Sequence, residues 1–146
     1  MYILDTNLYI QALQNAAFSL ELETFQQAAL PRLWVSAVVM FEVAVGAHDE
    51  AAAERYERWM LAPFRMRNRI LVPTASTWLL ASQMTRALRD MGGNATKLGQ
   101  RSFLNDILIA ASCREAGATL ITANRADYAL LQGVGGVRFM TSFPVL

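Results

Sequence analysis

The sequence Met1-Tyr2-Ile3-Leu4-Asp5-Thr6-Asn7 is a short apolar run that ends at a carboxylate and two small hydrogen-bonding residues. Such a run is typical of a buried β-strand. In a parallel α/β sheet, ligands bind in the crevice beyond the carboxyl ends of the strands, so Asp5 is a candidate for a functional site. The alternative is that Asp5 only caps the helix that follows, since Asp, Thr and Asn all favour such turns.

Outward from this stretch, short apolar runs alternate with helical patterns. This alternation predicts an α/β fold, in which a parallel sheet of four or five strands is flanked by helices on both faces. A chain of 146 residues without an evident linker is expected to form one domain, residues 1–146. The expected strands after the first are residues 33–35, 70–72, 119–122 and 137–140, and the expected helices are residues 8–13, 18–29, 37–48, 50–61 with Pro63 closing it, 76–90, 105–116 and part of 124–131.

Composition restricts the class of protein. With 54% hydrophobic and 17% charged residues, the chain is more apolar than a typical soluble domain, and we expect a homo-oligomer or a tightly held partner to cover the excess. The single cysteine, Cys113, excludes an intramolecular disulfide and suits a reducing compartment. No signal peptide and no membrane span of roughly 20 apolar residues is evident, so a soluble cytoplasmic protein is expected.

Three acids stand in apolar surroundings. Asp5 ends the first strand, Glu42 interrupts an apolar helix after the second strand, and Asp106 opens the apolar helix before the fourth strand. A buried ionised carboxylate is costly unless it is paired or bound to a metal. In a doubly wound sheet these three positions can converge on one crevice. The alternative is structural: Glu42 pairs with a distant arginine, and Asp106 complements its helix dipole.

The chemistry of three carboxylates favours a particular class of ion. Oxygen ligands select hard cations, which means Mg²⁺ or Mn²⁺ before Zn²⁺. Such an ion activates water near neutral pH and neutralises the charge that builds on a phosphodiester. The three acids therefore point to hydrolysis of a phosphate backbone.

Several motifs together resemble the PIN-domain ribonucleases, and most closely the VapC-like toxins of toxin–antitoxin modules. The motifs are Ile3-Leu4-Asp5-Thr6-Asn7, Ser36 followed six residues later by Glu42, the run that begins at Asp106, and Leu120-Ile121-Thr122-Ala123-Asn124-Arg125-Ala126-Asp127-Tyr128. The resemblance implies a Mg²⁺- or Mn²⁺-dependent endoribonuclease that acts on RNA, forms a homodimer and is neutralised by a cognate antitoxin. We expect a helix or peptide of that antitoxin to enter the acidic crevice.

The resemblance also implies roles for individual residues. Asp5, Glu42 and Asp106 correspond to metal ligands. Thr6, Asn7 and Thr122 correspond to residues that orient the site. Asn124 occupies a position that is acidic in many relatives, which puts a second metal in doubt, and Asp127-Tyr128 stands where relatives often have Asp-Phe.

Other readings remain open. Arg67, Arg69, Arg86 and Arg101 are candidates for contacts to RNA phosphates, although arginines at such spacings are often only a solvated face. Trp34, Tyr56, Trp59 and Trp78 are expected as core or dimer contacts. A phosphatase of the haloacid-dehalogenase type would need an acid where Asn7 stands. The main alternative is a catalytically inactive PIN-fold module that binds RNA or a protein partner.

Overall fold

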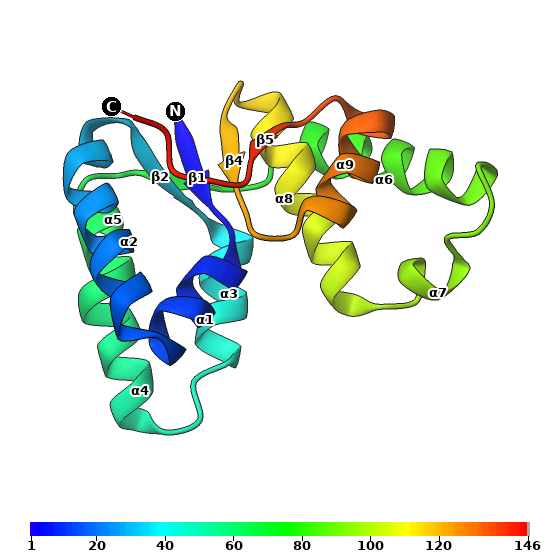
Figure 1. Cartoon of the computed structure of the whole chain (residues 1–146). Helices are drawn as coiled ribbons and strands as arrows, with labels where there is room; N and C mark the ends of the chain where they lie inside the picture. The colour runs from blue at the N-terminus through cyan, green and yellow to red at the C-terminus, as the bar shows by residue number, and fades with distance from the viewer. Residues whose placement is uncertain (146) are drawn as a thin grey trace.

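The computed structural model describes residues 1–145, apart from the side chain of Trp59, so the role expected for that tryptophan lies outside the described residues. Residues 1–145 contain a five-stranded sheet in the order β3-β2-β1-β4-β5, and all of its neighbouring strands are parallel. Helices flank the sheet, which confirms the predicted α/β fold (Figure 1). The strands are β1 (Tyr2–Leu4), β2 (Leu33–Ser36), β3 (Ile70–Leu71), β4 (Thr119–Ile121) and β5 (Arg138–Met140).

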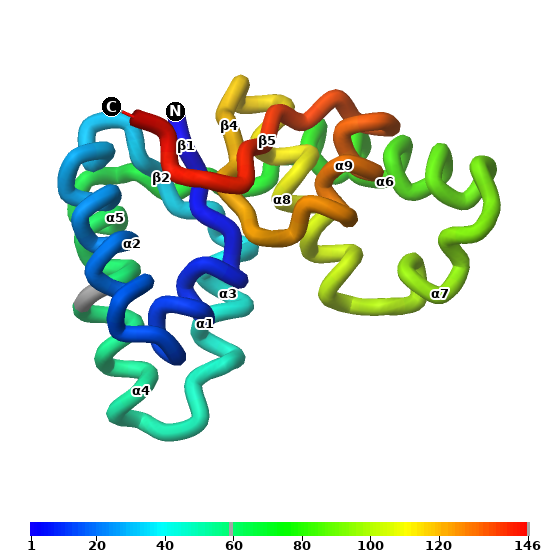
Figure 2. The backbone as a smooth tube through the Cα atoms, viewed as in Figure 1, coloured from blue at the N-terminus to red at the C-terminus, as the bar shows by residue number. Residues whose placement is uncertain are grey.

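The helices of the first half of the chain gather on one side of the view in Figure 1, and those of the second half on the other. Tyr2 and Phe143 both pack against Phe25, so the two ends of the described chain meet at the amino end of the sheet (Figure 2). The helices are α1 (Thr6–Gln14), α2 (Ala16–Ala29), the 3₁₀ turn η1 (Leu30–Arg32), α3 (Ala37–Val45), α4 (Glu50–Arg55), the π-helical η2 (Tyr56–Leu61), α5 (Ala62–Arg65), α6 (Ala75–Asp90), α7 (Ala95–Leu98), α8 (Arg101–Glu115) and α9 (Arg125–Gly135).

Two segments of the sequence are continuous apolar runs because they lie in the core. Ile3 and Leu4 of β1 are fully buried because β1 is the central strand, with β2 on one side and β4 on the other. Helix α8 packs against α6, α9 and α3, so Ile109 and Ala110 have no exposed surface. A strand or helix covered on all sides needs no polar face.

The order of strands places the acidic residues. From β1 the sheet continues in one direction to β2 and in the other to β4, so the topology reverses at the carboxyl end of β1. Such a reversal opens a crevice at the strand ends. The backbone N–H of Asp5 donates to the carbonyl of Ile121 (2.9 Å), which brings Asp5 beside Thr122.

The structure differs from the sequence prediction in four places. The segment after Gly93, expected as a loop, contains α7. Pro63 lies in the first turn of α5 instead of closing a helix, because a proline there needs no backbone N–H. Asp106 lies in the second turn of α8, which begins at Arg101, and does not open the helix. Helix α3 is not buried all round, since Phe41 is 47% exposed.

Within residues 1–145, none of the helices has the length and apolar character that crossing a membrane requires. The extension of one domain over all 146 residues stays a prediction.

Candidate functional site

Asp5 lies at the carboxyl end of β1, where it both caps α1 and faces the crevice. Its Oδ1 accepts the backbone N–H of Thr6 (2.9 Å). Its Oδ2 accepts the amide of Asn7 (2.6 Å) and the hydroxyl of Thr122 (2.6 Å). The side chain is only 2% exposed. The capping role and the site role weighed from the sequence therefore coexist in one carboxylate.

Glu42 enters the same crevice from the second turn of α3. Ser36 ends β2 and caps α3 by accepting the backbone N–H of Val38 (3.2 Å), which fixes where that helix begins. The Glu42 carboxylate accepts the hydroxyl of Thr6 and the amide of Asn105 (2.9 Å). Thr6 and Asn105 are the chain neighbours of Asp5 and Asp106, so these contacts bring three elements together.

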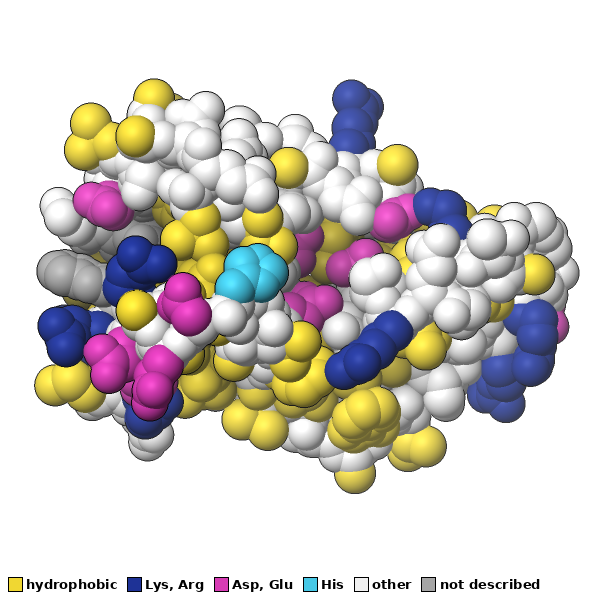
Figure 3. Space-filling view, turned by 90° about the horizontal axis from the view of Figure 1, so that it is seen from below, with side chains coloured by type: hydrophobic (Ala, Val, Ile, Leu, Met, Phe, Trp, Pro, Cys, Tyr) yellow, Lys and Arg dark blue, Asp and Glu magenta, His cyan; other side chains and the backbone are white. Residues whose placement is uncertain are grey.

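Asp106 completes the group from α8. Its Oδ1 lies 3.4 Å from the hydroxyl of Tyr128, and the same hydroxyl lies 3.5 Å from Oδ1 of Asp5. Asp5 and Asp106 therefore face one common atom. Figure 3, which looks at the carboxyl ends of the strands, shows acidic side chains in a hollow at the centre of this face.

The carboxylates of this acidic cluster (Asp5, Glu42 and Asp106) are under electrostatic strain. Burial raises the pKa of Asp5 to about 6, against the opposing effect of its hydrogen bonds, and the charge of Glu42 adds to the rise. Burial also raises the pKa of Asp106 to about 8, together with the charges of Asp5, Glu42 and Asp127. Perturbed carboxylates in a crevice are typical of functional sites.

The cluster has the donor chemistry of a site for a hard divalent cation. Among the described Lys and Arg side chains, none forms a salt bridge with its three acids. No three described His, Cys, Asp or Glu side chains already stand in the arrangement that closes on one ion. Mg²⁺ commonly keeps several waters and is held by only one or two carboxylates. Oxygen atoms and uncompensated negative charge thus fit the ion class expected from the sequence.

Among the supporting residues named from the sequence, Thr6, Asn7 and Thr122 form hydrogen bonds around Asp5, whereas the side chain of Asn124 does not reach it. Asn7 donates to Thr122 (3.0 Å) as well as to Asp5, and its side-chain oxygen accepts the backbone N–H of Ala123 (3.1 Å), which ties β1 to the end of β4. Asn124, in contrast, uses its oxygen to cap α9 and its amide to bind Asp127 (2.9 Å). Asn124 therefore acts on its own helix in this structure.

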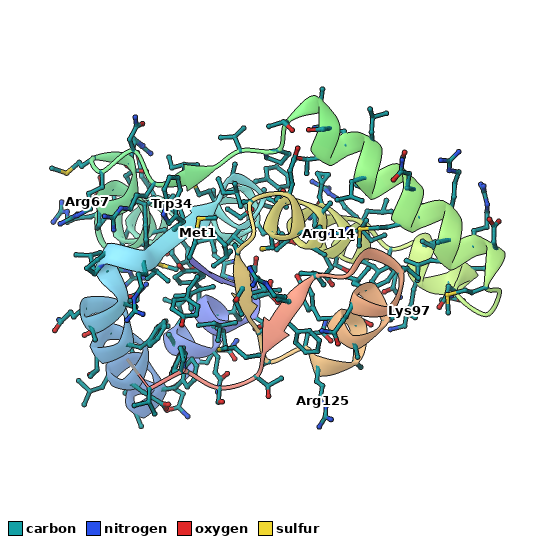
Figure 4. The ribbon with its side chains drawn as sticks, turned by 90° about the horizontal axis from the view of Figure 1, so that it is seen from above. Met1, Trp34, Arg67, Lys97, Arg114 and Arg125 are labelled. Atoms are coloured by element: carbon teal, nitrogen blue, oxygen red, sulfur yellow. The ribbon has the colours of Figure 1, made fainter. Side chains whose placement is uncertain are left out.

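The four candidate arginines do not form one surface. Arg69 donates to the carbonyl of Leu30, and Arg67 donates to that of Pro63 (2.9 Å). Both precede β3, at the amino end of the sheet, where Figure 4 shows Arg67 near Trp34 and Met1. Arg67 and Arg69 therefore lie at the opposite end of the sheet from the acids, and a contact of theirs to RNA stays a prediction. Arg86 is exposed on α6.

Arg101 is the candidate that contacts the helix carrying Glu42. Its guanidinium is 5.5 Å from the ring of Phe41, which precedes Glu42 on α3. The structure adds two residues that the sequence did not single out as parts of the site, Tyr128 and Asn105. Lys97 pairs with Asp127, the chain neighbour of Tyr128. The sequence signals were the tyrosine where relatives often have phenylalanine, and a polar residue next to Asp106.

Two adjoining grooves lie beside α1, and one of them reaches Glu42. The first has a volume of about 420 Å³, lies between α1, α2 and the α4–α5 segment, and is mainly apolar. The second shares Tyr9, Leu13 and Tyr56 with the first and extends to Glu42. The buried hydroxyl of Tyr9 finds no hydrogen-bond partner within the described part of the chain. The second groove, whose lining is partly polar, therefore reaches Glu42 from the surface of the helices.

Comparison with known proteins agrees with the geometry. A family model described as "PIN domain" matches residues 2–130. The chain resembles the structure of FitAB bound to an IR36 DNA fragment (TM-score 0.72, 19% identity, 100% of this chain and 98% of that chain). It also resembles FitAcB from Neisseria gonorrhoeae (TM-score 0.69, 21% identity, 97% of each chain) and DNA-bound VapBC from Salmonella typhimurium (TM-score 0.69, 20% identity, 95% of this chain and 96% of that chain). At these identities the likeness concerns the fold. No curated protein sequence matches.

Proposed function

The chain belongs to the PIN domain family, and on that premise we propose that it is a Mg²⁺- or Mn²⁺-dependent endoribonuclease that hydrolyses RNA phosphodiester bonds. The observation that carries the proposal is the convergence of Asp5, Glu42 and Asp106, with raised pKa values for both aspartates and no basic partner among the described residues. Carboxylates that only stabilise a fold are normally paired.

The residues of the chain divide the work of the site. Asp5, Glu42 and Asp106 would hold the ion, which when bound supplies positive charge against their repulsion and against the charge that builds on the phosphodiester. Three donors fix Asp5, and Thr6 with Asn105 fixes Glu42, so both carboxylates are oriented before an ion arrives. Such preorganisation lowers the cost of binding. Arg101, at the rim, is placed to attract RNA phosphate.

We further propose that the protein is the toxin of a toxin–antitoxin module. The similar structures are FitAB and VapBC complexes, and two of them are bound to DNA. In this chain the apolar groove next to Tyr9 continues to Glu42, which suits an amphipathic segment of an antitoxin whose end reaches the acids. A homodimer in the cytoplasm is part of the same proposal. Exposed apolar residues on three packed helices supply a surface for the dimer: Phe41, Val45, Trp78, Leu79 and Leu104.

A catalytically inactive module that binds RNA or a protein is the second candidate. Two observations favour it: Asn124 replaces an acid and serves its own helix, and the described acids do not yet close on one ion. Such a module would keep the fold and the groove while binding metal weakly or without consequence. The two candidates therefore differ in what metal binding does.

The test is a calorimetric titration of Mn²⁺ into the parent protein and into Asp5→Asn and Asp106→Asn, with cleavage of a structured RNA followed in the same samples. We expect metal binding to be lost and cleavage to fall by at least about 100-fold in both variants, since metal assistance supplies several kcal/mol. The matched control is Asp90→Asn, which removes an exposed carboxylate at the end of α6.

The outcomes separate the candidates. Loss of binding and cleavage together, with an unaffected Asp90→Asn, supports the metallonuclease. Metal binding without cleavage in the parent protein supports the inactive module. A parent protein that binds no divalent ion would show that the three acids are structural.

A further inference from the structure

Tyr128 lies under the acidic cluster although its ring belongs to the core. The side chain, in the first turns of α9, is fully buried, and its ring packs against that of Phe139 with 6.2 Å between centroids. Only its hydroxyl reaches the cluster, at 3.4 Å from Oδ1 of Asp106 and 3.5 Å from Oδ1 of Asp5. A buried phenol hydroxyl normally needs a hydrogen-bond partner, and the partners here are two carboxylates of the cluster.

The two aspartates differ in how many donors hold them. Asp5 accepts three short hydrogen bonds, from the backbone of Thr6 and the side chains of Asn7 and Thr122. Asp106 has no described hydrogen-bond donor other than Tyr128. A hydroxyl has one proton and can serve one acceptor at a time. Since Asp5 is already held, the proton of Tyr128 is best used by Asp106.

We propose that Tyr128 is a positioning residue whose hydroxyl donates to Asp106 and aims that carboxylate at the crevice it shares with Asp5. The inference rests on the proposed metal site and names the group that orients its least constrained ligand. Asp106 is repelled by Asp5, Glu42 and Asp127. Without a donor behind it, the carboxylate would turn away from these charges and toward solvent. Groups that orient metal ligands are commonly worth about 10- to 100-fold in metal affinity.

The alternative is that Tyr128 only fills the core. Tyr128→Phe separates the two roles, because the substitution keeps the ring that packs on Phe139 and removes only the hydroxyl. We expect this variant to bind Mn²⁺ at least about 10-fold more weakly in calorimetry without RNA. Tyr2→Phe is the matched control, since it removes the same atom at the opposite end of β1 and should leave the affinity unchanged. An unchanged affinity in Tyr128→Phe would overturn the proposal.

A second measurement tests the contact without any ion. In metal-free buffer, the Tm values of Tyr128→Phe, Asp106→Asn and the double variant form a double-mutant cycle. If the hydroxyl holds Asp106, the two single shifts should not add up in the double variant. Additive shifts would show that the two groups do not interact, and the proposal would fail. A parent protein that binds no Mn²⁺ but gives a non-additive cycle would defeat the metallonuclease proposal and leave the contact standing.

Discussion

Charged side chains are partnered differently at the two ends of the sheet. At the amino ends of the strands, three arginines each donate to a backbone carbonyl: Arg69 to Leu30, Arg114 to Gly135, and Arg138 to Gly117. At the carboxyl ends, Asp5, Glu42 and Asp106 gather without a salt bridge among the described residues. Positive charge is thus dispersed over carbonyl groups at one end, and negative charge is concentrated at the other.

The polar groups at the two ends of the sheet therefore have different roles: those at the amino end stabilise the fold, whereas those at the carboxyl end form the candidate site. An arginine on a carbonyl satisfies an acceptor and completes a loop, and its removal leaves that carbonyl without its partner. Carboxylates that repel one another make no such contribution to the apo fold, since each raised pKa reports an ionised form that burial disfavours. The carboxyl end therefore retains an electrostatic cost that an incoming cation can relieve.

A rise in pH is expected to lower the stability of the metal-free protein strongly. Because folding raises the pKa values of Asp5 and Asp106 to about 6 and about 8, the folded protein holds protons that the unfolded chain has released. Raising pH from about 4 to 8 should therefore destabilise the metal-free protein, by about 3 kcal/mol from Asp5 alone at about 1.4 kcal/mol per pKa unit, with a further loss from Asp106. Urea unfolding at pH 4.5 and pH 8.5 measures this loss.

Two additions to that experiment assign the effect. Asp106→Asn should flatten the upper part of the profile, between about pH 6 and 8, since that carboxyl no longer titrates. Mn²⁺ should restore stability at pH 8.5 by binding the folded state. A profile of the parent protein that is flat or rises over this range would mean that the acids are not strained.

A smaller effect is expected at the amino end of the sheet. Arg69→Met removes the donor from the carbonyl of Leu30 and should destabilise the protein by about 1–3 kcal/mol at every pH tested. RNA cleavage by the folded fraction should not change, because Arg69 lies away from the acids. Arg89→Met, at an exposed position on α6, is the control and should stay within about 0.5 kcal/mol of the parent. Reduced cleavage in Arg69→Met at full folding would contradict the division between the two ends.

The central strands could be predicted from the sequence because a strand that is buried on both faces is a continuous apolar run. Asp5 directly follows Ile3 and Leu4, and Thr122 directly follows Leu120 and Ile121. Each of these buried apolar runs therefore ends at a polar residue of the candidate site. Helix α7 was missed, since four residues between two loops give no period to detect. The exposure of Phe41 was also missed, because an apolar helix reads the same whether a neighbour covers it or leaves one face open.

The three acids of the site could be predicted because a charged residue within or beside an apolar run can be recognised in the sequence as a costly buried charge. Asp5, Glu42 and Asp106 each interrupt an apolar run, and the structure brings them together. The hydroxyl of Tyr128 gave no comparable signal, because its partners lie 22 and 123 residues away in sequence. Arg67 and Arg69 precede β3 in the sequence, which already puts them at the amino end of that strand, and their contact to RNA stays a prediction.

The weakest change is expected for RNA binding at Arg101. Arg101 lies over Phe41, one residue from Glu42, whereas Arg86 is exposed on α6. If RNA approaches the carboxyl end, Arg101→Met should weaken binding by about 5-fold at most and lower the salt dependence of log Kd by about one phosphate contact. Arg86→Met should do neither.

Fluorescence titrations of a structured RNA into the Asp5→Asn background, which holds the RNA uncut, measure both quantities over a range of salt. An arginine that binds an RNA phosphate releases about one counterion, so its removal must lower the slope of log Kd against log salt concentration. Equal slopes for Arg101→Met and Arg86→Met would therefore mean that RNA does not approach the cluster past Arg101.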